Sequence, residues 1–152
     1  MKLGMIVVFD ANDEELVKTD MIDVLRKSSD IKFCLVNNNC SEMFNYVLME
    51  IADECENVTV IHMKKNKGTS LAIRAGSRYM NSHFNLKFLG YITNLQGENL
   101  IQAIQLFANH HNEIRDQNTQ NQLREILKPA FFKKAFSISN YYQQINCKLD
   151  PK

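Results

Sequence analysis

The sequence of 152 residues carries little net charge and has no long apolar run. Its formal net charge of +1 gives no electrostatic reason to expect a nucleic-acid partner. No apolar stretch approaches the roughly 20 residues that span a bilayer, and the first residues show no cleavable signal pattern. We therefore expect a cytoplasmic protein without nucleic acid as a partner.

The cysteines follow no spacing that is typical of a zinc site. A cytoplasmic protein keeps its thiols reduced. We therefore expect no disulfide and free thiols at every cysteine, namely Cys34, Cys40, Cys55 and Cys147.

Short runs of β-branched and other apolar residues predict strands. The run Ile6–Phe9 is continuously apolar, as in a central strand that is covered on both faces. We expect the run that begins at Val58 to be buried as well. The predicted strands are Ile6–Phe9, Ile31–Val36, Val58–Ile61 and Leu86–Ile92.

Segments with apolar residues at helical spacing follow each of these runs. The predicted helices cover Glu14–Arg26, a stretch capped by Ser41, a stretch after Gly68, and Glu98–His110. In the third helix we expect Thr69 or Ser70 to supply the capping hydroxyl. The residues expected on its inner face are Leu71, Ala72, Ala75 and Tyr79.

Strand and helix therefore alternate along residues 1–112, and each connection has the length of one helix. Such alternation predicts a three-layer α/β/α domain with a mainly parallel, Rossmann-like sheet. Residues 113–152 are expected to form a helical C-terminal extension on the same domain. We expect Ala130–Ile145 to be a helix folded back over the sheet edge; the alternative is a basic, aromatic surface helix for a partner or, as the weaker option, for a membrane surface.

In parallel α/β sheets the ligand lies outside the carboxyl ends of the strands. We expect Gly68, between a strand and a helix, to adopt a positive φ, and the backbone N–H groups at that helix start can face an anion. The polar loops at the four strand ends are Asp10–Asp13, Asn37–Ser41, Lys64–Gly68 and Thr93–Gly97.

The order and spacing of these loops resemble the nucleotide-binding half of the family 2 glycosyltransferases, which have the GT-A fold. Val7–Glu15 matches the opening strand and loop of that family, Val36–Glu42 the end of its second strand, and Asn66–Gly76 its Asn-x-Gly-x-x-x-Ala motif. The resemblance covers about Ile6 to Phe107. It implies a nucleotide or nucleotide-sugar site at Asp10, Asn12, Asn37, Asn38, Asn66, Gly68, Arg74, Thr93 and Asn94.

The chain departs from this family where the family binds metal. The family's second-strand Asp is Asn37 here, and no Asp-x-Asp follows the fourth strand, since no acidic residue occurs between Asn57 and Gly97. Mg²⁺ and Mn²⁺ need carboxylate ligands in such a site, so we expect no divalent metal, no other cofactor and no catalytic residue. The basic residues that can hold a diphosphate instead are Lys64, Lys65, Lys67 and Arg74.

Two functions remain open at this point. The first is a family 2 glycosyltransferase-like domain that binds a nucleoside diphosphate or nucleotide sugar. We expect no appreciable sugar transfer by the isolated chain, which ends before the second half of the family. The alternative is a non-catalytic pseudo-glycosyltransferase that acts as a protein interaction or regulatory module, as a homodimer or with a partner protein.

Overall fold

The computed structural model describes residues 3–11, 13, 19–38, 40–65, 68–93, 101–105, 107 and 136–137. Within these residues the strands form one sheet in the order β3-β2-β1-β4-β5, and every neighbouring pair is parallel. The strands are β1 (Leu3–Phe9), β2 (Ile31–Asn37), β3 (Val58–His62), β4 (Phe88–Ile92) and β5 (Phe136–Ser137). The predicted α/β architecture with a parallel sheet is confirmed.

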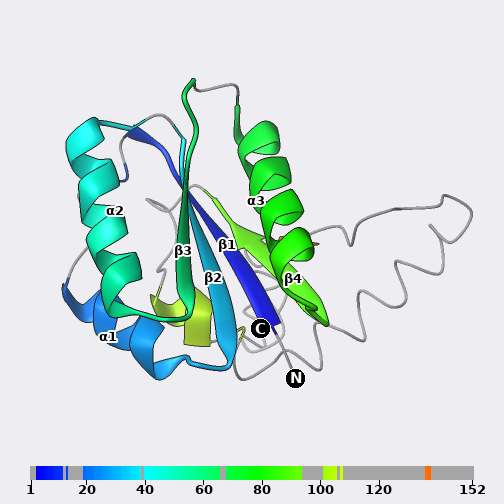
Figure 1. Cartoon of the computed structure of the whole chain (residues 1–152). Helices are drawn as coiled ribbons and strands as arrows, with labels where there is room; N and C mark the ends of the chain where they lie inside the picture. The colour runs from blue at the N-terminus through cyan, green and yellow to red at the C-terminus, as the bar shows by residue number, and fades with distance from the viewer. Residues whose placement is uncertain are drawn as a thin grey trace, which may run out of the picture.

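Helices cover both faces of this sheet (Figure 1). On one face lie α1 (Thr19–Lys27), α2 (Glu42–Glu54) and the helical residues 101–105. On the other face lies α3 (Thr69–His83). The described residues therefore form three layers, with the sheet in the middle.

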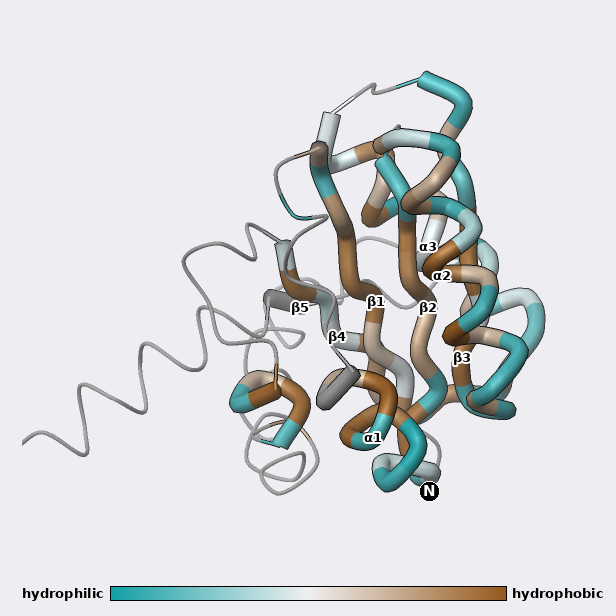
Figure 2. Tube along the Cα trace, turned by 90° about the vertical axis from the view of Figure 1, so that its left-hand side faces the viewer, coloured by the Kyte–Doolittle hydropathy of each residue, from teal (hydrophilic) through white to brown (hydrophobic). Residues whose placement is uncertain are grey.

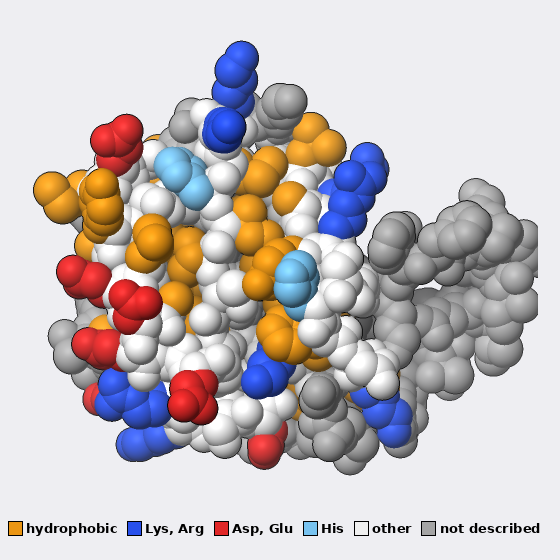
Figure 3. Space-filling model, in the orientation of Figure 1, with side chains coloured by type: hydrophobic (Ala, Val, Ile, Leu, Met, Phe, Trp, Pro, Cys, Tyr) orange, Lys and Arg blue, Asp and Glu red, His pale blue; other side chains and the backbone are white. Residues whose placement is uncertain are grey.

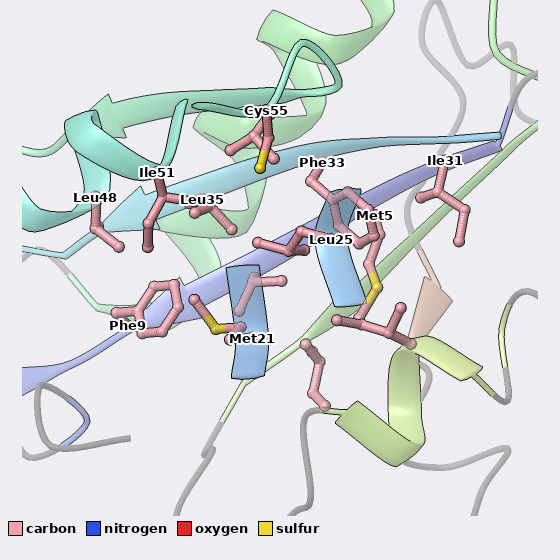
Figure 4. Close-up of a cluster of buried hydrophobic side chains, with 14 of the residues drawn as sticks. Met5, Phe9, Met21, Leu25, Ile31, Phe33, Leu35, Leu48, Ile51 and Cys55 are labelled. Atoms are coloured by element: carbon pink, nitrogen blue, oxygen red, sulfur yellow. The ribbon is translucent and has the colours of Figure 1, made fainter. Parts of the chain in front are cut away.

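β1 is the centre of the core, because all of its residues are buried. Met5 and Val7 pack against α1 and α2, whereas Ile6 and Val8 pack against α3. This explains the continuous apolar run, since a parallel strand covered on both faces needs apolar side chains in both directions. Figure 2 shows the hydrophobic residues concentrated along β1 and β2, and Figure 4 shows Met5 among the side chains of the first face.

The start of α2 agrees with the sequence prediction. Ser41 is the N-cap, and its Oγ accepts a hydrogen bond of 3.1 Å from the backbone N–H of Phe44. An N-cap hydroxyl satisfies one of the donors that the first helical turn leaves without a partner. Phe44, Leu48 and Ile51, at helical spacing, are buried, and Val47 is half-buried against the same cluster.

The strand predicted to begin at Val58 is present as β3, and Val58 is buried, but the prediction that the whole run is buried is wrong. Thr59, Val60 and Ile61 are only half-buried, because β3 is the last strand on its side of the described sheet. A β-branched run has the same appearance in a sequence whether the strand lies at the edge or in the centre of a sheet.

For α3 the predicted cap is wrong, and the predicted inner face is wrong in part. Its N-cap is Gly68, and neither Thr69 nor Ser70 caps it, because the helix already begins at Thr69. Of the residues predicted for its inner face, Ala72 is buried, Ala75 and Tyr79 are half-buried and Leu71 is 37% exposed, and the buried line of the helix is Ala72, Gly76 and Met80. The helix lies so close to β1 at Gly76 that a Cβ added there would be 2.9 Å from Cγ2 of Ile6, which places the line through Gly76, and not Leu71, against the sheet.

The expected helix over Ala130–Ile145 is wrong at the residues that the structure describes there. Phe136 and Ser137 form the strand β5, paired in parallel with Gly90 and Tyr91 of β4. The outer edge of β4 offers backbone donors and acceptors that such a segment can pair with. The rest of 113–152 lies outside the described residues, as do residues 14–18 of the first predicted helix. In the described ranges no helix has the length and apolar character of a membrane span.

Candidate functional site

The loop after β1 is a tight turn held by Asp10 and Asp13. The backbone N–H of Asp13 donates to the carbonyl oxygen of Asp10 at 2.9 Å, and the backbone N–H of Asp10 donates to Oδ2 of Asp13 at 2.8 Å. Asp13 is buried, whereas Asp10 is half-buried. Of these two carboxylates, Asp10 is therefore the one that a ligand can reach.

Asn38 joins this turn to the end of β2. Its Nδ2 donates to Oδ1 of Asp10 at 3.0 Å, and its backbone N–H donates to the carbonyl oxygen of Phe9 at 3.0 Å. The side chain is 1% exposed. Asp10 and Asn38, two of the predicted site residues, therefore lie together, but Asn38 contacts the protein itself.

Asn37 is used inside the turn between β2 and α2. Its Oδ1 accepts a hydrogen bond of 2.7 Å from the backbone N–H of Cys40, and its Nδ2 lies 3.5 Å from Oδ1 of Asn45. The residue is 0% exposed. Asparagine favours such a turn because its short amide can bond backbone groups a few residues along the chain. Asn37 therefore positions the start of α2 instead of facing a ligand.

Burial changes the acidity of two groups near the core. Burial raises the pKa of the Asp13 carboxyl, and the nearby Asp10 carboxylate raises it further, while the hydrogen bond from the Asp10 backbone acts in the opposite direction. Burial raises the pKa of the Cys34 thiol to about 12, so Cys34 is a poor nucleophile at neutral pH. The described cysteines Cys34, Cys40 and Cys55 are free thiols, as expected, and Cys147 lies outside the described residues.

The connection from β3 to α3 supplies the exposed positive charge. Lys64 and Lys65 are exposed at the end of β3, and Arg74 is exposed on α3. Gly68 has φ +100° and ψ 162°, which confirms the predicted positive φ. The first turn of α3 contains no acidic residue, so the partial positive charge of the helix start is not neutralised there.

The structure brings only part of the predicted site together. Asp10, Asn37 and Asn38 lie at the linked ends of β1 and β2, whereas Thr93 is half-buried directly after β4. Among the described residues no group of three His, Cys, Asp or Glu side chains is arranged to hold a metal ion. The predicted site residues Asn12, Asn66 and Asn94 lie outside the described residues, as does the segment 94–97 where the family's metal motif would fall.

Sequence reasoning missed the buried Asn57 at the opposite end of the sheet. Its Nδ2 lies 2.9, 3.0 and 3.1 Å from the carbonyl oxygens of Leu25, Ser28 and Ile31. The side chain thereby holds the turn between α1 and β2. A single amide directly before an apolar run was the available signal, because a polar side chain at the start of a buried strand needs partners nearby.

Comparisons with known proteins returned no match among family models, curated proteins or solved structures. The α/β architecture is therefore supported by the strand order and pairing of this chain alone. The resemblance to the family 2 glycosyltransferases stays a prediction from the sequence motifs.

Proposed function

We propose that the chain is a GT-A-like domain of the family 2 glycosyltransferase type. It binds the diphosphate of a nucleotide or nucleotide sugar at the carboxyl ends of its strands. The connection between β3 and α3 carries the proposal. Gly68 is exposed and has φ +100°. In the chain it follows the exposed Lys64 and Lys65 and directly precedes α3. A backbone of this form leaves room for an anion beside the N–H groups of the helix start.

The proposal assigns different tasks to the predicted residues. Lys64, Lys65 and Arg74 bind the diphosphate through charge-assisted hydrogen bonds, and the half-buried Asp10 and Thr93 contact the nucleoside. Asn37 and Asn38 support the loops from within. Binding requires no divalent cation, and the isolated chain transfers no sugar at an appreciable rate. The protein acts in the cytoplasm.

One observation favours the alternative of a non-catalytic interaction or regulatory module. Asn37 and Asn38, which the family resemblance assigns to the nucleotide, are buried and bonded to groups of the protein itself. A nucleotide could contact these amides only after such bonds break, and a buried polar group without its partner costs roughly 1–3 kcal/mol.

A calorimetric titration of a nucleoside diphosphate, with and without Mn²⁺, separates the two functions. Diphosphate binding predicts weak affinity that Mn²⁺ does not change, and a loss of roughly tenfold in the double variant Lys64→Gln, Lys65→Gln. Lys27→Gln is the matched control. It also removes a lysine, but at the end of α1, next to the amino-terminal start of β2 and away from the proposed site.

Other results of this titration would contradict the proposal. No heat of binding under either condition leaves the interaction module as the function. A strict Mn²⁺ requirement, or hydrolysis of nucleotide sugars at about 1 s⁻¹ or faster, indicates an active transferase instead.

A further inference from the structure

In β3 the backbone N–H and C=O groups of alternate residues point toward β2, and those of the residues between them point away from it. The carbonyl oxygen of Asn57 accepts from the N–H of Phe33 at 2.7 Å, and the N–H of Met63 donates to the carbonyl oxygen of Asn37 at 2.9 Å. In a strand the backbone groups of successive residues point to alternate sides. The N–H and C=O groups of Val60 and His62 therefore point away from β2.

Features that commonly protect an edge strand are absent from β3. The segment Val58–His62 contains no proline, no lysine and no acidic residue, although such residues usually prevent an edge from pairing with another strand. Figure 3 looks onto this side of the molecule and shows hydrophobic side chains gathered between α2 and α3. In the described part of the chain, β3 has β2 as its one neighbour in the sheet.

We propose that β3 pairs in antiparallel orientation with β3 of a second copy of this chain, about a two-fold axis through Val60. This proposal does not depend on nucleotide binding. Val60 then lies opposite Val60 of the second copy, and Thr59 lies opposite Ile61. In this register the two Val60 residues exchange both of their backbone hydrogen bonds, because their N–H and C=O groups point outward from each sheet.

The register also keeps the two layers of helices continuous. Val58 and Val60 pack on the α1 and α2 side, whereas Ile61 and Met63 pack on the α3 side. A two-fold axis through Val60 places even-numbered residues opposite even-numbered ones, so like faces meet. A shift by one residue would place the α2 side of one copy beside the α3 side of the other.

Charge favours a second copy over an unrelated strand. The chain is acidic before β3, with Asp53 and Glu56 exposed, and basic after it, with Lys64 and Lys65 exposed. Two such strands in antiparallel order bring each acidic end beside a basic end. Glu56 lies in the turn directly before β3 and Lys64 directly after the strand, so the register centred on Val60 brings Glu56 to the same end of the paired strands as Lys64 of the second copy, where opposite charges favour the pairing.

Sedimentation velocity over about 1–100 µM of the full chain tests the proposal. We expect the mass to rise from 17.6 kDa to twice that value. The variant Val60→Pro should remain monomeric, because it removes an outward N–H without removing a bond to β2, and edge strands tolerate proline. Val60→Ala is the matched control, since it keeps the N–H and should still dimerise. A wild-type monomer at about 100 µM, or a dimer of Val60→Pro, overturns the proposal.

Cysteine cross-linking tests the register without relying on proline. In an antiparallel pair that exchanges both hydrogen bonds the Cα atoms lie about 5.5 Å apart, which suits a disulfide. Val60→Cys should therefore form a covalent dimer under mild oxidation. Thr59→Cys alone should not, whereas a mixture of Thr59→Cys and Ile61→Cys should. Equal cross-linking of Val60→Cys and Thr59→Cys overturns the register.

Reversal of charge distinguishes a second copy from other partners. Glu56→Lys or Lys64→Glu alone should weaken the dimer at least threefold, and the double variant should regain the wild-type association. A double variant as weak as the single ones overturns the contact between Glu56 and Lys64. A monomer that instead captures an extended segment of another protein at β3 overturns the second copy as the occupant.

Discussion

Buried asparagine side chains hold both ends of the sheet, but their partners differ. At the amino end, the amide of Asn57 lies against three backbone carbonyl oxygens, so its partners are fixed parts of the fold. At the carboxyl end, Asn38 donates to the half-buried carboxylate of Asp10, and exposed lysines follow the neighbouring strand. At the amino end, asparagine therefore bonds to the backbone. At the carboxyl end it bonds to an ionisable side chain that solvent can reach.

Asn57→Ala should have the largest effect, because it leaves several buried carbonyl oxygens at the amino end without their donor. We expect the free energy of unfolding to fall by about 3 kcal/mol, measured by urea denaturation. Asn45→Ala is the matched control, since it removes long contacts, 3.5 Å to Nδ2 of Asn37 and 3.6 Å to Sδ of Met49, and should cost about 0.5 kcal/mol. Equal losses in the two variants would mean that Asn57 does not hold this end.

Asn37→Asp tests the carboxyl end by introducing the carboxylate that the resembling family has there. The new oxygen can still accept from Cys40, but a charge enters a position that is 0% exposed and the donor to Asn45 is lost. We expect a loss of about 2 kcal/mol in urea denaturation. The nucleoside diphosphate titration of this variant should show no gain in affinity. A clear gain would show that a ligand reaches position 37 despite its burial.

Gly68→Ala measures backbone strain at the same end. Because φ +100° with ψ 162° is a region that only glycine commonly occupies, alanine should lower the free energy of unfolding by about 1–3 kcal/mol. A Cβ added there meets nothing within 4 Å, so the cost of alanine comes from the backbone, and Gly68→Val should cost at least as much because a β-branched residue is more restricted at positive φ. An unchanged melting temperature in both variants would contradict the strain.

Asp13→Asn should have the smallest effect, visible as a change of pH dependence. The pKa of Asp13 is raised above its ordinary 3.8 in the folded protein. At pH values between these two pKa values the folded state therefore keeps a proton on Asp13 that the unfolded state has lost. Stability should therefore fall as the pH rises from the ordinary pKa through the raised one. The variant should lack this decrease in urea denaturation at a series of pH values. If the free energy of unfolding fell equally with pH in both proteins, a group other than Asp13 would be responsible.

The sequence predicted the central parts of the fold because their signals are local. The apolar run of β1 and the hydroxyl of Ser41 before α2 each depend on a few adjacent residues. Alternation of strand and helix then predicted the parallel sheet. The positive φ of Gly68 followed in the same way, from its place between a strand and a helix.

Other features depend on contacts between distant segments, and the sequence could not supply them. The inner face of α3 follows Gly76 rather than Leu71, because close approach to Ile6 outweighs hydrophobicity there. At the candidate site the positions of Asn37 and Asn38 were predictable, but their partners were not. Whether an amide bonds to its own turn or faces a ligand depends on the folded geometry around it.

The central place of β1 has a consequence for the order in which the protein assembles. β1 is the first of the described strands in the chain. It lies between β2 and β4, so that Leu3 is paired with Ile31 of β2 on one side and with Phe88 of β4 on the other. During synthesis its second edge stays open until β4 has left the ribosome, because contacts of high sequence separation form late. In that interval the apolar residues of β1 and its open edge can pair with other chains, so the nascent chain is prone to aggregation until β4 emerges.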